Sequence, residues 1–154
     1  MSSLHQEPPA DCDPRIARLY AYWCSLRPVP GGLPGRQHLD PGAIADLLPW
    51  VWMADVRHAP LRFKYRLVGT EQVAAMEADY TGRWMDEAHP DFMLSPAYGL
   101  FVAAAVDGTV GYREGPPLFQ GKGHGPVERV LLPMARDSHR VDMLLAMTIH
   151  HARA

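Results

Sequence analysis

The stretch FKYRLVGTEQVAAM, residues 63–76, changes its hydrophobic period partway along. Its first part alternates apolar and polar side chains, as a β-strand with one buried face does. After Gly69 the apolar side chains recur at helical spacing, and Thr70 is a residue type that caps helix N-termini. The stretch therefore predicts a strand that leads directly into a short helix. Its aromatic and methionine side chains either fill the core or form one wall of a ligand cavity.

Capping and periodicity signals predict further elements on both sides of this stretch. The dipeptides Asp13-Pro14 and Asp40-Pro41 each pair an N-cap residue with a first-turn proline. Residues 141–149 alternate without a break, which is typical of a strand. Helices are expected over residues 13–27, 40–48, 70–80 and 96–107, and strands over 50–56, 63–68, 109–114, 127–135 and 141–149.

Composition and charge exclude several classes of protein. The chain has 154 residues, of which 47% are hydrophobic and 21% charged, which is typical of one globular domain. Its net charge of -2 and pI near 6.4 argue against nucleic-acid or anionic-lipid partners. The longest apolar run, residues 99–106, is far shorter than the roughly 20 residues of a membrane span. The N-terminus has no secretory pattern. We therefore expect a cytoplasmic protein without membrane contact.

The motifs that resemble catalytic or metal sites are weak. DEAH at residues 86–89 lacks the phosphate-binding loop that nucleotide hydrolysis needs. Asp86, Glu87, His89 and Asp91 are close in sequence, but adjacent carboxylates project in different directions and no metal-ligand spacing supports them. We therefore expect no catalytic residue and no metal, hence no enzyme. A small enzyme with His89 and Asp91 as an acid–base pair is a third option.

Two oppositely charged strand residues are predicted to pair. Phe63, Tyr65 and Leu67 are expected on one face of their strand, with the residues between them on the other. Arg66 then shares this second face with Asp55 of the preceding strand, opposite or diagonal across a hairpin. We interpret Asp55 and Arg66 as a structural ion pair, with a ligand-anchoring arginine as the alternative.

Two groups of apolar side chains carry the functional hypotheses. The first group suits an adaptable ligand pocket, because methionines are flexible and the aromatic rings carry polar tips. Its members are Tyr65, Met76, Tyr80, Trp84, Met85, Phe92, Tyr98 and Phe101. The second is a helical stripe that can bury against a partner subunit, made of Ile16, Leu19, Tyr20 and Trp23. In the alternative to a pocket, the first group simply fills the core.

Several segments together resemble the PAS (Per-Arnt-Sim) fold, and more closely a bacterial subfamily of small, mostly stand-alone PAS-like proteins. They are LPGRQHLDPGAI at 33–44, LLPWVWMADV at 47–56, FKYRLVGT at 63–70, TGRWMDE at 81–87 and ERVLLPMARD at 128–137. The resemblance implies an α+β fold, in which a five-stranded antiparallel sheet carries helices on one face and an N-terminal helical extension packs outside the sheet or against a second copy. It divides the chain into an N-terminal tail, helix and connector (1–32), a PAS-like domain (33–150) and a C-terminal tail (151–154).

The resemblance also implies a non-enzymatic sensing or signalling role. A small organic ligand would bind in the domain, and the signal would pass to a separate protein partner or through a homodimer. The alternative is a structural adaptor with a filled core and no ligand. Photoactive flavin is not expected, because its cysteine motif is missing from the sequence. Haem is not expected either, because residues 96–107 contain no histidine.

Overall fold

The computed structural model describes residues 7–28, 30–116 and 124–152; the outermost parts of the two expected tails lie outside these ranges. Within them, five strands form one antiparallel sheet in the spatial order β2-β1-β5-β4-β3. The strands are β1 (Val51–Arg57), β2 (Arg62–Val68), β3 (Gly111–Gly115), β4 (His124–Met134) and β5 (Met143–Ala152). The predicted α+β fold with a five-stranded antiparallel sheet is confirmed.

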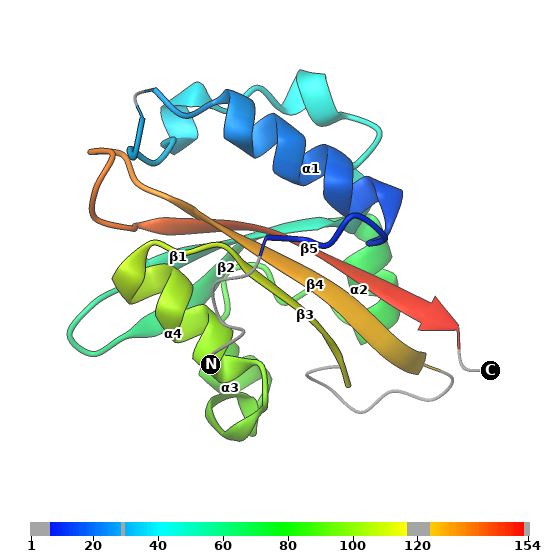
Figure 1. Cartoon of the computed structure of the whole chain (residues 1–154). Helices are drawn as coiled ribbons and strands as arrows, with labels where there is room; N and C mark the ends of the chain where they lie inside the picture. Colours follow the sequence, from blue (N-terminus) through cyan, green and yellow to red (C-terminus); the bar gives the residue numbers. More distant parts are fainter. Residues whose placement is uncertain (1–6, 29, 117–123, 153–154) are drawn as a thin grey trace.

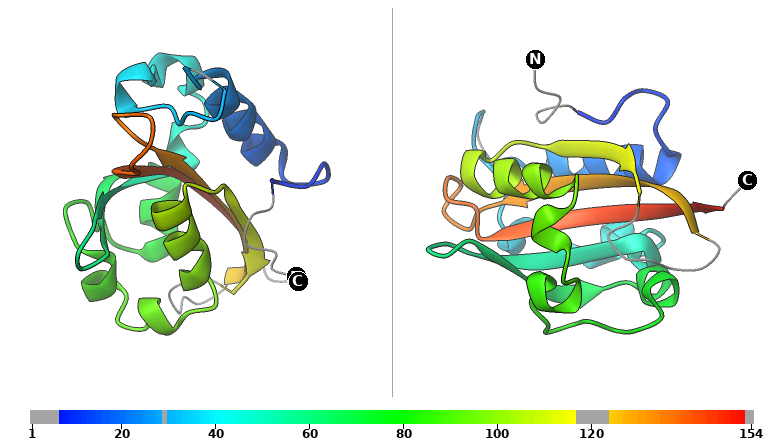
Figure 2. Two further views of the ribbon diagram at one scale, coloured as in Figure 1. Left: turned by 60° about the vertical axis from the view of Figure 1, so that its left-hand side comes forward. Right: turned by 90° about the horizontal axis from the view of Figure 1, so that it is seen from below.

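The helices cover both faces of this sheet (Figure 1). Helix α1 (Pro14–Ser25) lies on one face, and α2 (Thr70–Met76), α3 (Met85–Ala88) and α4 (Tyr98–Asp107) lie on the other (Figure 2). We call these the outer and the inner face. Short 3₁₀ turns connect the elements: η1 (Arg36–His38), η2 (Pro41–Ile44), η3 (Leu48–Trp50) and η4 (Phe92–Leu94). Among the described helices, none has the length and apolar character that a bilayer span requires.

Three helix predictions were wrong in extent. The helix expected over 40–48 is only the two turns η2 and η3, because Gly42 disfavours a helix and Pro49 cannot continue one. Helix α2 stops at Met76, since Glu77 adopts a left-handed conformation with φ 59°. Helix α4 begins two residues later than expected. Ser95, the predicted N-cap, instead ends η4 and donates its hydroxyl to the Phe92 carbonyl.

Strand pairing decides which side chains share a face. In β4 and β5, Arg129 lies opposite Thr148, and Glu128 lies opposite Ile149. Side chains alternate along a strand, so Arg129 and Thr148 project to the inner face and Glu128 to the outer. In the β1–β2 pair the register shifts between Met53 and Ala54. Leu67 lies opposite Met53, and Tyr65 lies opposite Ala54. Because Met53 and Ala54 are adjacent and project to opposite faces, the prediction that Leu67 shares a face with Tyr65 was wrong.

Helix α1 packs directly on the outer face. Ile16, Leu19 and Trp23 are each at most 2% exposed, and the indole nitrogen of Trp23 donates to the Pro133 carbonyl at 3.0 Å. The stripe expected at a partner interface therefore contacts the sheet of its own chain. Tyr20, its fourth member, is half-buried.

The strand–helix junction generates the first prediction. A Cβ atom at Gly69 would lie 2.2 Å from the Leu48 carbonyl oxygen and 2.5 Å from that of Pro49. Backbone atoms there cannot move aside, so Gly69→Ala is expected to lower the free energy of unfolding by about 3 kcal/mol. Chemical denaturation measures this loss. Gly42→Ala is the control, because its closest neighbour is a side-chain oxygen at 3.3 Å. Equal stability of the two variants would contradict the prediction.

Candidate functional site

A small cavity lies between the inner face of the sheet and helix α2. Its lining is Trp52, Tyr65, Gln72, Met76, His89, Arg129, Thr148 and His150. The cavity volume is about 20 Å³, which is room for about one water molecule. Most of this lining is polar, although Gln72, His89, Arg129 and Thr148 are each only 3–4% exposed. Buried polar groups in such numbers have to be matched with partners or with a bound molecule.

The sequence around Gly69 brings helix α2 over the cavity. Because Gly69 has no side chain, the chain can pass close to the Leu48 and Pro49 carbonyls and turn from β2 into α2. This turn carries Gln72 and Met76 to the cavity. The inner-face positions of β1, β2, β4 and β5 supply the opposite wall.

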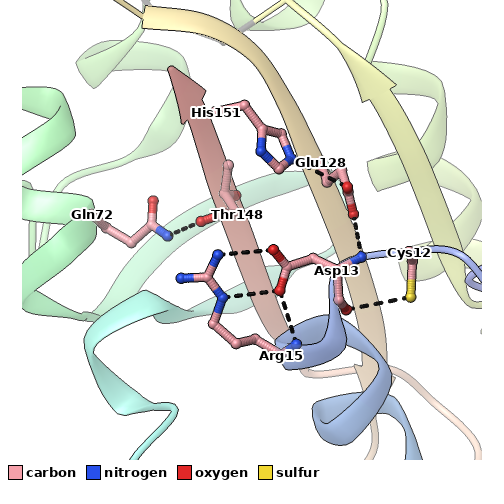
Figure 3. A network of polar contacts seen from close by, with 7 residues as sticks. All are labelled: Cys12, Asp13, Arg15, Gln72, Glu128, Thr148 and His151. Atoms are coloured by element: carbon pink, nitrogen blue, oxygen red, sulfur yellow. Dashed lines mark hydrogen bonds and ion pairs between the residues drawn. The ribbon is translucent and has the colours of Figure 1, made fainter.

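Gln72 ties helix α2 to the sheet. Its side-chain nitrogen donates to the carbonyls of Trp50 and Thr148, the second of which is drawn in Figure 3. Its side-chain oxygen lies 3.1 Å from Nε2 of His150. The hydroxyl of Thr148 in turn accepts from the indole nitrogen of Trp52 at 2.9 Å. These bonds hold the sheet wall and the helix wall in one arrangement.

Tyr65 of β2 and His89, which directly follows α3, form a buried pair in the lining. The Tyr65 hydroxyl lies 2.7 Å from Nε2 of His89, and the ring of Tyr80 packs against both. Burial, together with the smaller effect of the nearby positive charge of Arg129, lowers the pKa of His89 to about 4. Burial also raises the pKa of Tyr65. Both groups are therefore neutral near pH 7.

Arg129 is the charged member of the lining. It is 3% exposed, and its Nε atom has no hydrogen-bond partner. Within the described residues, no carboxylate forms an ion pair with it. Arg113 of β3 lies directly opposite in the strand register, so the two arginine side chains project to the same, inner face. Burial, with a smaller contribution from the positive charge of Arg113, lowers the pKa of Arg129 to about 10.

Two of the side chains expected around a pocket, Tyr65 and Met76, line this cavity, and Tyr80 contacts its wall. The others are not part of the lining. Phe92 and Phe101 meet edge to face with ring centroids 4.9 Å apart, and Tyr98 packs on Phe92. Met85 is fully buried, and Trp84 lies under the Arg62 guanidinium at 4.2 Å.

Sequence reasoning did not expect most of this lining in a ligand pocket. It considered His89 for a metal cluster or an acid–base pair, and it left out the apolar Trp52 and the polar Gln72, Arg129, Thr148 and His150. A signal was present in the last strand, where Thr148 and His150 have the same parity as Leu144 and Ala146. A polar residue at an apolar parity points into a covered face, and this marks a candidate site.

The remaining predicted groups lie away from the cavity. Asp55 and Arg66 are 3.5 Å apart, but about half exposed, so water screens their attraction. Asp86 and Glu87 bond to Arg62 instead of approaching a common centre with His89. Asp91 is exposed while His89 is buried, so the two do not form an acid–base pair in one cavity.

Comparison with known proteins gives one match. A family model described as PAS domain matches residues 13–88, from the N-cap of α1 to the end of α3. No curated protein and no solved structure matches the chain. The matched part includes the strand–helix stretch and four of the cavity residues, Trp52, Tyr65, Gln72 and Met76.

The lowered pKa of His89 predicts a pH dependence of stability. Below its ordinary value of 6.5 the unfolded chain takes up a proton at His89, whereas the folded chain does so only near 4. The free energy of unfolding should therefore fall from pH 6.5 to pH 4, by up to about 3 kcal/mol from this group. Urea titrations at several pH values measure the fall.

His89→Gln should lose this part of the pH dependence, because glutamine can still bond to Tyr65 but does not titrate. His139→Gln is the control, since His139 is exposed on the β4–β5 loop. If the free energy of unfolding falls equally with pH in the wild type and in His89→Gln, the pKa of His89 is not lowered in the folded chain.

Proposed function

Since the chain contains a PAS-like domain, we propose that it is a non-enzymatic sensor that binds a small molecule in the cavity beneath α2. The observation that carries the proposal is the convergence of buried polar side chains on one internal space. A core that only stabilised the fold would be filled with apolar side chains, because buried polar groups stabilise a structure only when they are fully paired. Recognition of a ligand supplies a reason for their presence.

Strand β4 connects the cavity on the inner face with helix α1 on the outer face. Arg129 lines it from β4, and the neighbouring Glu128 projects to the outer face. There the Glu128 carboxylate accepts a hydrogen bond from the backbone nitrogen of Asp13, the N-cap of α1, at 2.9 Å (Figure 3). A ligand that shifts β4 at this position changes the support of α1. We propose that the domain switches between two arrangements of α1 that differ in affinity for a partner protein or a second copy.

The alternative role, an adaptor that binds through the apolar stripe of α1, has less support. Ile16, Leu19 and Trp23 already pack on the sheet of the same chain. Their exposure to a partner would require α1 to leave the sheet, which uncovers a large apolar area. Such a release is compatible with an output step of the sensor, but not with a permanent adaptor surface.

Filling the cavity tests the proposed function. Met76→Trp places a larger side chain in a space of about 20 Å³, so it should weaken ligand binding at least about tenfold, or ~1.4 kcal/mol. Met93→Trp is the matched control, because Met93 is 57% exposed on η4. A thermal-shift screen of small metabolites, with mass spectrometry of compounds retained after gentle purification, identifies the ligand first. A wild-type protein that retains no compound and is stabilised by none of the library would contradict the proposal.

A further inference from the structure

We propose that the cavity binds a small carboxylate anion, with the carboxylate on the guanidinium of Arg129. This inference rests on the proposed sensing function and names the chemical class of the ligand. It is drawn from an imbalance of charge, in which the buried Arg129 has no ion-pair partner among the acidic side chains of the described residues.

Arg129 is a buried cation. Its side chain is fixed to the inner face by the β4 register and is 3% exposed. A guanidinium remains charged at neutral pH even when burial lowers its pKa to about 10. A buried charge is retained at an acceptable free energy only where an opposite charge and hydrogen-bond partners surround it. Its Nε atom has no such partner in the described part of the chain.

The protein does not supply the opposite charge from its own acidic side chains. Residues 1–6, 29, 117–123 and 153–154 contain no Asp or Glu, so every acidic side chain belongs to a described residue. None of these is within ion-pair distance of Arg129. The adjacent acid, Glu128, is turned to the outer face, where it bonds to Asp13 and His151 (Figure 3).

A second arginine strengthens the imbalance. Arg113 lies opposite Arg129 across the β3–β4 ladder and is half-buried. Like charges directly opposite in a sheet are destabilising. Like Arg129, Arg113 has no ion-pair partner among the described acidic residues. A carboxylate bound to Arg129 would balance one of these two charges and so reduce the repulsion between them.

The remaining lining selects a carboxylate among anions. A guanidinium presents parallel N–H groups that match the two oxygens of a carboxylate. The hydroxyls of Tyr65 and Thr148 are further polar groups beside Arg129, while Trp52 and Met76 present apolar surface to a short hydrocarbon tail. A space of about 20 Å³ holds about one water molecule, so the walls must move outward to admit any anion. A planar carboxylate head requires less of this movement than a tetrahedral phosphate or sulfate, which is larger and needs more donors.

The test titrates the full chain with sodium formate, acetate, propionate and butyrate, at constant ionic strength adjusted with sodium chloride. Isothermal titration calorimetry and thermal unfolding measure binding, and sodium sulfate and phosphate are the comparison anions. We expect saturable stabilisation by at least one carboxylate and a smaller, non-saturable effect of sulfate and phosphate. Saturable binding of phosphate or sulfate in preference to every carboxylate would overturn the assignment of the ligand class.

Arg129→Met separates a binding role from a structural one. Methionine keeps the apolar stem and removes the buried charge, so the ligand-free variant should unfold at a higher temperature than the wild type and lose its response to carboxylate. If Arg129 only stabilises the fold, the variant unfolds at a lower temperature. Arg140→Met is the control, because Arg140 is exposed on the β4–β5 loop and its replacement should leave binding unchanged.

His89 provides a local readout of the same site. The positive charge of Arg129 contributes to its low pKa of about 4. An anion on Arg129 should therefore raise the pKa of His89, and a histidine NMR titration with and without acetate measures the shift. The pKa should also rise in Arg129→Met without any ligand. No change of the His89 pKa at a carboxylate concentration that saturates the calorimetric signal would place the anion elsewhere.

The inference and the proposed function can fail separately. If an uncharged metabolite stabilises the wild type and Met76→Trp abolishes this effect, the sensing function is supported and the carboxylate assignment is wrong. If a carboxylate stabilises the wild type and Arg129→Met equally, the assignment to Arg129 is wrong. If neither carboxylates nor a metabolite library stabilise the wild type, both proposals are wrong.

Discussion

The pairing of β4 with β5 is the constraint on which the rest of this structure depends. It sends Glu128 and Arg129, adjacent in the chain, to opposite faces of one sheet. On the outer face Glu128 binds the start of α1, and on the inner face Arg129 and Thr148 meet the residues carried by α2. A slip of one residue in this register would exchange the two faces, burying the carboxylate inside and turning the guanidinium toward α1. The site and the attachment of α1 are therefore two results of one register.

The cavity lining combines a network of hydrogen bonds between helix and sheet with the positive charge of Arg129, which has no ion-pair partner among the described residues. Gln72 and Thr148 connect the helix to the sheet through hydrogen bonds, and Tyr65 bonds to His89, which burial keeps neutral. Against this network, Arg129 has the features of a group whose counter-charge comes from outside the chain. In the proposed anion site, donors that are held in place before binding would lower the free-energy cost of ordering them. In the proposed switch, the same network would link occupancy of the cavity to the position of β4.

Part of this picture was predictable from local patterns. The alternation in 63–68 and 141–149 placed the strands, and Asp13-Pro14 marked the start of α1, because these signals act between residues a few positions apart. The prediction that Leu67 shares a face with Tyr65 failed at a bulge, which depends on the neighbouring strand and not on the sequence of β2 itself. The same limit applies to the cavity. Apolar and aromatic residues were expected to line it, yet polar residues from distant segments form most of its wall.

The amino-acid sequence by itself determined the order of the strands and the face that each strand residue takes in a regular ladder. Only the tertiary structure decided that His89, Arg129 and Thr148 meet around one space, and that Glu128 is engaged elsewhere. The physical reason is that periodicity and capping are short-range, whereas the balance of charge in a buried volume depends on which distant segments the sheet register brings together.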